Sequence, residues 1–173
     1  MSKSTLKSHL QSLGKEQIIE VVLELYDNMK PVKEYFEFYL SPNEKEMLER
    51  YRAVIVAEFY PSGRNGFPKT RFSVAKKAIS DFRNLKPAPE LLADLMLTLP
   101  ELACKLAYEC GGMTEQYSIS TPNNFKAALE YMRKNNLLNR FKPRCQDCLN
   151  YASNCGYGLE DDISEIYHAY YGN

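Results

Sequence analysis

The chain has 173 residues, of which 45% are hydrophobic and 25% are charged. This composition is typical of a globular domain, and the length predicts a single domain over 1–173. The 22 basic and 22 acidic side chains balance, which argues against a general nucleic-acid or membrane binder, because such proteins carry a positive surface. The best apolar run, 18–26, is interrupted by glutamates and is too short for a bilayer, which needs about 20 apolar residues.

The first residues, MSKSTLKSHLQSLGKEQ, are polar and contain no apolar segment of the kind that a secretory signal needs. We therefore expect a cytoplasmic protein that does not use a membrane. Because the cytosol keeps thiols reduced, the five cysteines are expected to be free. We expect no cofactor.

Apolar residues recur at helical spacing along the whole chain, and no strand-like alternation stands out. A loop rich in Gly and Pro, 60–72, interrupts the helical pattern near its middle. The expected helices lie around 6–13, 18–29, 32–39, 42–59, 73–85, 90–110, 121–134, 137–152 and 163–171. About nine to ten short helices with short connections predict an all-α protein, a compact multi-helix bundle with antiparallel neighbours.

Two helix boundaries are expected from prolines. Pro100 is expected to divide or kink the apolar region 90–110, because proline lacks the backbone N–H of a helix interior. Thr121-Pro122 is expected to begin a helix, with 111–120 as the loop before it.

Three segments read SLGKEQIIEVVLELYDNMKPVKEYFEFYLSPNE, PKTRFSVAKKAISDF and PAPELLADLML. They resemble a family of uncharacterised bacterial proteins that is catalogued only as a domain of unknown function. The resemblance runs over most of the chain, and RFSVAKKAISDF is its most particular part. It implies a helical cytosolic bacterial protein and brings no catalytic residue, cofactor or partner.

Three of the cysteines lie in RCQDCLNYASNC, 144–155. Cys145 and Cys148 form a C-x2-C pair, and with Cys155 they are candidate zinc ligands. A fourth ligand could come from His168, Cys104 or Cys110. The alternative is packing, because the three cysteines share one helix face and a free cysteine packs as a small hydrophobe. A redox pair is a third interpretation, but it normally begins a helix after a strand. We favour packing.

The segment 60–86 contains seven basic residues and a single acid, Asp81. Its loop leads directly into a helix N-terminus, where backbone N–H groups attract anions. The candidate binding residues are Arg64, Lys69, Arg71, Lys76 and Lys77. Alternatively, these cations are merely solvated or pair with the acids at 160–165. Nucleic acid is disfavoured, because among the phenylalanines of the segment only Phe67 is expected to be exposed for base stacking.

Other catalytic patterns are incomplete. Glu165 and His168 form a Glu-x-x-His motif, but a di-iron site needs a second such motif and the chain has only two histidines. The sequence therefore predicts a non-catalytic binding or interaction module that uses 60–86 and takes a protein partner or an anionic ligand. The alternatives are a zinc-binding protein with its cysteine cluster at 145–155 and an enzyme that uses carboxylates in a helical cleft.

Overall fold

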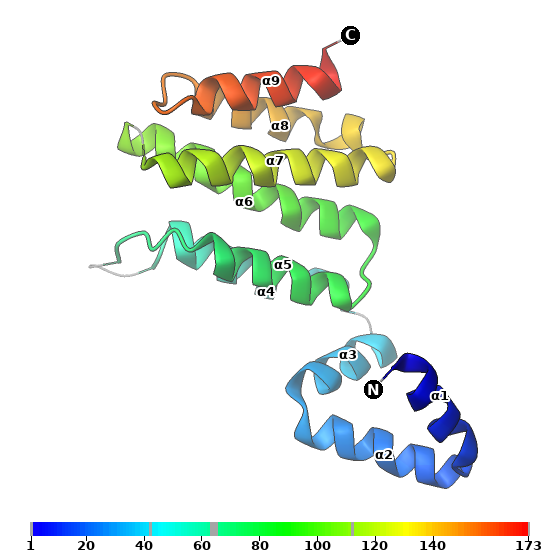
Figure 1. The fold of residues 1–173 in the computed structure, drawn as a ribbon. Coiled ribbons are helices and arrows are strands. Elements are labelled where there is room, and N and C mark those ends of the chain that lie inside the picture. The colour runs from blue at the N-terminus through cyan, green and yellow to red at the C-terminus, as the bar shows by residue number, and fades with distance from the viewer. Residues whose placement is uncertain (1, 42, 63–65, 112, 173) are drawn as a thin grey trace. The chain divides into compact units, whose positions relative to one another are not determined.

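The computed structural model describes residues 2–41, 43–62, 66–111 and 113–172. Within these ranges the chain forms nine helices and no strand (Figure 1). The predicted all-α fold is confirmed, and no described helix has the length and apolarity needed to cross a bilayer. The helices are α1 (Lys3–Ser12), α2 (Lys15–Asn28), α3 (Lys30–Leu40), α4 (Glu44–Phe59), α5 (Phe72–Asn84), α6 (Pro89–Cys110), α7 (Glu115–Lys134), α8 (Leu138–Ala152) and α9 (Leu159–Tyr171).

The helices divide into an N-terminal unit, Met1–Asn43, and a C-terminal unit, Glu44–Asn173. In the N-terminal unit α2 packs on α3, and Phe38 is the one side chain that is buried among its described residues. The core lies in the C-terminal unit. That a single domain spans 1–173 stays a prediction.

The C-terminal unit is built from helices that run antiparallel to their chain neighbours (Figure 1). The central helix, α6, packs against α4, α5, α7 and α8, and α9 covers α7 and α8. This arrangement buries apolar side chains from every helix of the unit, which supply the main free energy of folding. The largest fully buried apolar side chains are Phe59, Phe82, Phe125, Ile55, Leu95, Leu97, Leu99, Leu129, Met132, Leu159 and Ile163.

Helix α6 continues across Pro100, so of the two outcomes expected there, division or a kink, the division into two helices does not occur. A proline inside a helix costs about 3 kcal/mol or more. Leu95, Leu97 and Leu99 are fully buried in the same stretch, and burying each contributes about 1.5–3 kcal/mol. The burial of these leucines therefore outweighs the cost of the proline and keeps the helix whole.

Helix α7 begins at Glu115, so the helix start expected at Thr121-Pro122 is also wrong. Thr114 caps the helix by accepting a hydrogen bond from the backbone N–H of Tyr117. The buried Tyr117 hydroxyl then donates to the carbonyl of Ala103 at 2.8 Å. This contact with α6 fixes the first turn of α7, and such a non-local bond leaves no mark in the local sequence.

Candidate functional site

The end of the loop between α4 and α5 is held by one buried residue, Glu58. The backbone carbonyl of Glu58 accepts hydrogen bonds from the N–H groups of Lys69 and Thr70, both at 2.9 Å. Its side chain accepts three more from Arg71, through the backbone N–H, Nε and a terminal guanidinium nitrogen, at 3.3, 2.9 and 2.7 Å. The hydrogen bonds from Arg71 lower the pKa of Glu58 despite its burial. The end of the loop is thus fixed at the start of α5.

An aromatic cluster supports the same junction. The ring of Phe72, the first residue of α5, meets Phe59 at a centroid distance of 5.6 Å and Tyr117 at 5.2 Å, both edge to face. Such pairs stabilise by about 0.5–1.5 kcal/mol beyond the area they bury. Phe67, by contrast, is 83% exposed, as expected from the sequence.

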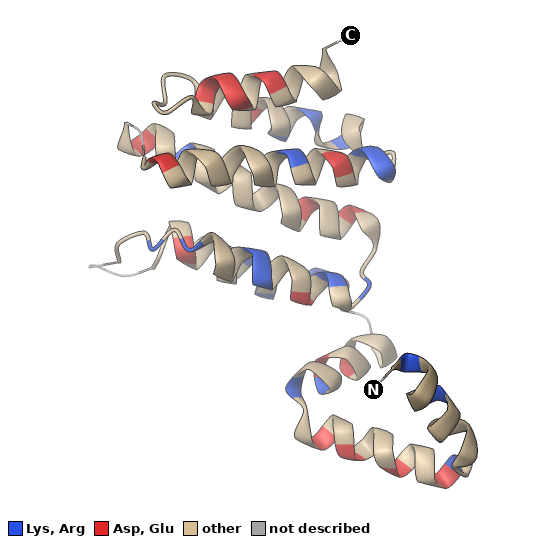
Figure 2. Cartoon of the chain, in the orientation of Figure 1, with Lys and Arg blue, Asp and Glu red and all other residues tan. Residues whose placement is uncertain are grey.

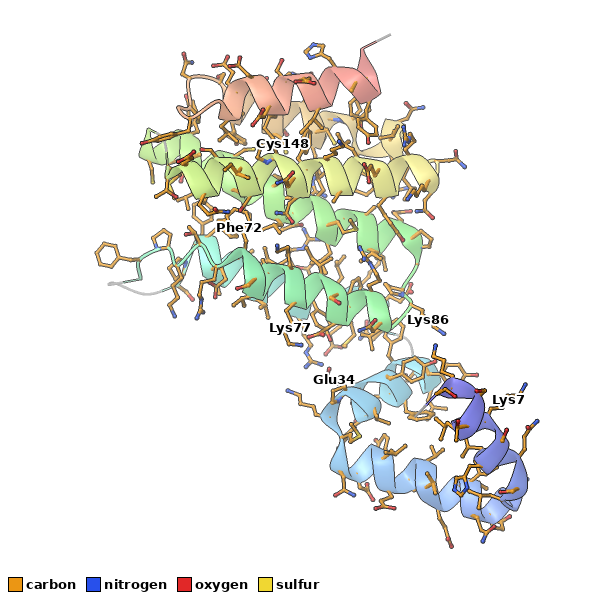
Figure 3. The ribbon with its side chains drawn as sticks, in the orientation of Figure 1. Lys7, Glu34, Phe72, Lys77, Lys86 and Cys148 are labelled. Carbon is orange, nitrogen blue, oxygen red and sulfur yellow. The ribbon has the colours of Figure 1, made fainter. Side chains whose placement is uncertain are left out.

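The five predicted binding residues do not form one cluster. Arg64 lies outside the described residues. Arg71 is engaged with Glu58, and Lys77 pairs with Asp81 at 2.8 Å across one turn of α5. The expected partner acids at 160–165 are therefore the wrong ones for these two cations. Lys77 lies at the surface of α5 (Figure 3) and Lys69 is exposed on the loop.

Lys76 differs from the other predicted residues because it lines a groove between α5, α6 and α7. The groove has a volume of about 210 Å³ and is lined by Lys76, Ile79, Ser80, Arg83, Met96, Asn124 and Ala127. We call it the Lys76–Arg83 groove. Across the described residues neither Lys76 nor Arg83 has a carboxylate within ion-pair distance. A terminal guanidinium nitrogen of Arg83 lies 3.3 Å from the sulfur of Met96, so most of its N–H donors remain for a ligand.

The groove combines charge with an apolar floor. Ile79 and Met96 are largely buried beneath it, whereas Lys76, Ser80 and Arg83 are exposed at its edge. The amide of Asn124 donates to the carbonyl of Ser120 at 2.7 Å, which leaves its side-chain oxygen as an acceptor. This arrangement suits a small anionic group attached to an apolar one.

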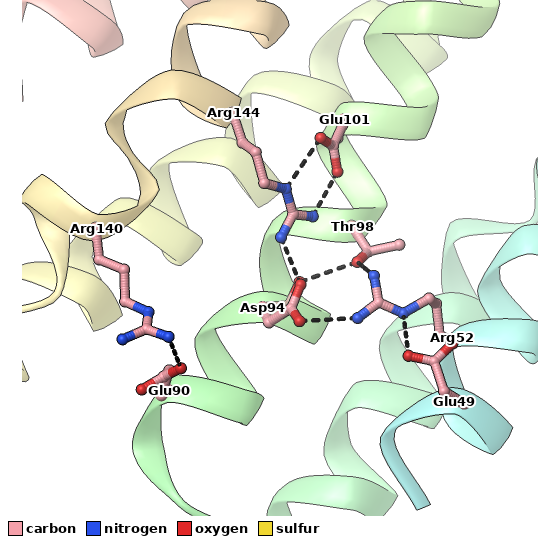
Figure 4. Close-up of polar contacts among 8 residues, drawn as sticks. All are labelled: Glu49, Arg52, Glu90, Asp94, Thr98, Glu101, Arg140 and Arg144. Carbon is pink, nitrogen blue, oxygen red and sulfur yellow. Dashed lines mark hydrogen bonds and ion pairs between the residues drawn. The ribbon is translucent and has the colours of Figure 1, made fainter. Parts of the chain in front are cut away.

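A second polar cluster connects α4, α6 and α8 (Figure 4). Arg144 of α8 reaches both carboxylate oxygens of Glu101, at 3.1 and 2.5 Å, and one oxygen of Asp94 at 2.5 Å. Arg52 of α4 reaches the other Asp94 oxygen at 2.8 Å. Burial acts to lower the pKa of Arg144, but its bonds to Glu101 and Asp94 outweigh burial and raise it.

The Arg52–Asp94–Arg144–Glu101 network was not predicted from the sequence. Asp94 and Glu101 lie two turns apart on one face of α6, but their partners are 42 to 50 residues away along the chain. A cleft with convergent acids would favour a carboxylate enzyme. Here Asp94 and Glu101 both form ion pairs with arginine. The network therefore connects helices and offers no free general base.

Four of the five cysteines lie in the core of the C-terminal unit, and Cys110 is exposed. Cys104, Cys145 and Cys148 are fully buried, and Cys155 follows α8 with its thiol 3.4 Å from the carbonyl of Tyr151. Burial raises the pKa of Cys145 to about 11, and a hydrogen bond with Cys104 together with burial raises that of Cys148. A thiol that stays protonated is a poor nucleophile. The burial agrees with packing.

Of the three candidates for a fourth zinc ligand, Cys104 lies beside Cys148, whereas Cys110 and His168 are exposed. His168 is exposed on α9, and its Nδ1 lies 2.8 Å from the carbonyl of Ser164. Of the residues that the structure describes, no three His, Cys, Asp or Glu side chains are grouped so that they could hold a metal ion. The metal alternative thus gains no support from the geometry.

Comparison with known proteins gives a family for the fold. Residues 1–170 match the model of a family described as Family of unknown function (DUF6155). The chain belongs to this family. The resemblance noted from the sequence is thereby confirmed, and the match covers the N-terminal unit, the groove and all but the last three residues of the C-terminal unit. No curated protein and no solved structure matches the chain.

Membership in the DUF6155 family assigns no activity to any residue.

Proposed function

We propose that this DUF6155 protein is a non-catalytic binding module that holds an acidic segment of a protein partner on the surface of 60–86. The working part of that surface is the Lys76–Arg83 groove. The observation that supports the proposal is the pair of cations beside an apolar floor, each without a carboxylate partner among the described residues. Arg71 and Lys77, which have partners within the chain, would contribute less.

The dimensions favour a short peptide segment. Lys76 and Arg83 are seven residues apart on α5, which places their Cα atoms about 10 Å apart along the helix axis. An extended chain covers this distance in about three residues, so two carboxylates of one segment can meet both cations. An apolar side chain between the carboxylates would lie over Ile79 and Met96. The groove is smaller than sites for drug-sized molecules, which hold about 300–1,000 Å³.

The expected setting is a bacterial cytoplasm. All five cysteines are free thiols, which suits the reducing cytosol. Nucleic acid is the disfavoured partner, because within the segment Arg71 and Lys77 are neutralised by Glu58 and Asp81. In its described part Phe67 is the one exposed aromatic side chain, whereas base stacking uses several.

The proposal is tested by titrating the full chain with a four-residue peptide, capped at both ends, that has glutamate first and last and two leucines between them. Backbone amide NMR shifts should move around the groove, and added salt should weaken the binding. Replacing Lys76 and Arg83 together by alanine should weaken it about tenfold or more. The matched control is the pair Lys126→Ala and Lys134→Ala, exposed lysines of α7. No binding by the unmodified protein, or equal loss in the control, would refute the proposal.

A further inference from the structure

The N-terminal unit carries an unusually large share of exposed apolar side chains. Its described residues include eight large hydrophobic side chains that are substantially exposed: Leu6, Ile19, Val21, Leu23, Leu25, Met29, Tyr39 and Leu40. Exposed apolar surface that gathers into a patch marks an interaction site in soluble proteins. The question is which partner fits it.

The exposure follows from the sequence of α2. Ile18, Val22 and Tyr26 share one face of the helix and are half-buried. Apolar residues continue on both sides of that face, through Val21 and Leu25 on one side and through Ile19 and Leu23 on the other. The apolar arc therefore covers more than half of the helix circumference, which is wider than the stripe a helix on the surface of a domain needs.

The described residues of the unit include no disulfide or metal site that would compensate for a small core. Residues 1–43 contain no cysteine, and no metal-binding group is found among the described ones. Units of about 40 residues usually need a disulfide, a metal or association to be stable. Association is the remaining route.

A groove on the unit has a defined charge. It has a volume of about 480 Å³, and its lining includes Leu6, Leu10, Leu13 and Ile18 as apolar floor and Lys3 and Lys7 as basic rim. Helix α1 contains no acidic residue. In the part of the unit that the structure describes, neither lysine has an ion-pair partner, and Lys7 projects away from its helix (Figure 3).

The complementary surface is on α2 of the same unit. Glu16, Ile19, Glu20, Leu23 and Asp27 fall at helical spacing on one face, and all five are exposed. Figure 2 shows the acidic residues along α2 and the basic ones on α1. The face thus offers two apolar side chains bordered by acids, which matches a groove of apolar floor and lysine rim.

We propose that the N-terminal unit is a self-association surface, in which the α1–α2 groove of one chain takes the Glu16–Asp27 face of α2 from a second copy. Since each copy carries both surfaces, a two-fold axis lets both contacts form at once and closes the assembly as a dimer. The dimer covers Leu6, Ile19 and Leu23 and pairs Lys3 and Lys7 with the partner's acids. This inference does not depend on the Lys76–Arg83 groove.

The test is the mass of the full chain in solution, by sedimentation over a range of concentrations, with two complementary variants. One variant carries Lys3→Glu and Lys7→Glu; the other carries Glu20→Lys and Asp27→Lys, which preserve helix α2 because lysine is a good helix former. Like charges then face each other in either dimer, and dissociation constants should rise about tenfold or more. An equimolar mixture of the two should dimerise again, because each groove then meets a face of opposite charge.

The mixture separates contact between chains from contact within one chain, since attraction between α1 and α2 of the same copy cannot be restored by adding another variant. Lys126→Glu with Lys134→Glu, exposed on α7, is the matched control and should leave the dimer intact. Leu23→Ser should weaken the dimer without changing any charge. A monomer at every concentration, a dimer that both variants leave unchanged, or variants that stay monomeric when mixed would each overturn the proposal, as would an open series of larger species.

Discussion

Glu58→Gln is the sharpest test of how the loop before α5 is held. Glu58 is 6% exposed and its carboxylate accepts three hydrogen bonds from Arg71. Hydrogen bonds to charged groups contribute about 1.5–3 kcal/mol, and because the Arg71 side chain is 54% exposed solvent screening places the loss at the lower end. We expect about 1.5–2 kcal/mol of destabilisation at pH 7, or a fall in Tm of about 3–8 °C for a chain of this size.

The pH dependence gives a second readout. The pKa of Glu58 is lowered in the folded state, so its contribution to stability is present above the unfolded value of about 4.3 and is lost as pH falls through the lower folded value. Urea unfolding at pH 7 and pH 3.5 should show the difference between Glu58→Gln and the unmodified protein shrinking in acid. Glu165→Gln, on an exposed position of α9, should change stability by less than about 0.5 kcal/mol. A loss from Glu58→Gln that is as small as this, or that is equal at both pH values, would show that the reasoning is wrong.

Four further predictions address the other sites. Arg144→Met should destabilise the protein by about 3 kcal/mol, because it leaves Asp94 and Glu101 without their shared partner. Arg140→Met, which loses an exposed pair with Glu90, should cost less than about 1 kcal/mol. Equal losses of the two variants in chemical denaturation would contradict this. Chelator should leave the melting temperature unchanged, and a fall that zinc reverses would support the cysteine site after all. An aromatic disulfide reagent should modify Cys110 rapidly and the other cysteines slowly, because Cys110 alone among the five is exposed; several fast thiols would refute the packing. Single-stranded RNA and DNA should not bind even at low salt, and binding that weakens steeply as salt rises would reassign the basic segment.

Much of the helical content could be predicted because it depends on neighbouring residues. The apolar spacing of Ala75, Ala78, Ile79 and Phe82 predicted the buried face of α5, and all four are buried. The same reasoning placed Cys145, Cys148 and Cys155 on one helix face. Cys145 and Cys148 are buried on α8, whereas Cys155 is buried after the helix has ended at Ala152. The reasoning failed at Pro100 and at Thr121-Pro122, where the local rule for proline was overridden by side chains buried against other helices.

The candidate site was likewise predicted only in part from the sequence. The sequence indicated that 60–86 is basic, and the structure shows which of its cations are already neutralised: Glu58 and Asp81 pair with Arg71 and Lys77 and leave Lys76 beside Arg83. Arg83 lies in the basic segment but was not among the predicted binding residues, because its position in the sequence did not distinguish it from the other cations of the segment.

By itself, the sequence determined the helical class of this protein, the inward faces of helices such as α5 and the basic character of one segment. These properties follow from the spacing of apolar and charged residues that are a few positions apart along the chain. Only the tertiary structure decided that Arg52 and Arg144 would meet at Asp94, that α7 would begin early on the contact between Tyr117 and Ala103, and that Lys76 would line a groove with Met96 and Asn124. Each of these joins helices that are distant along the chain, and the contacts exist only once the burial of apolar faces has brought those helices together.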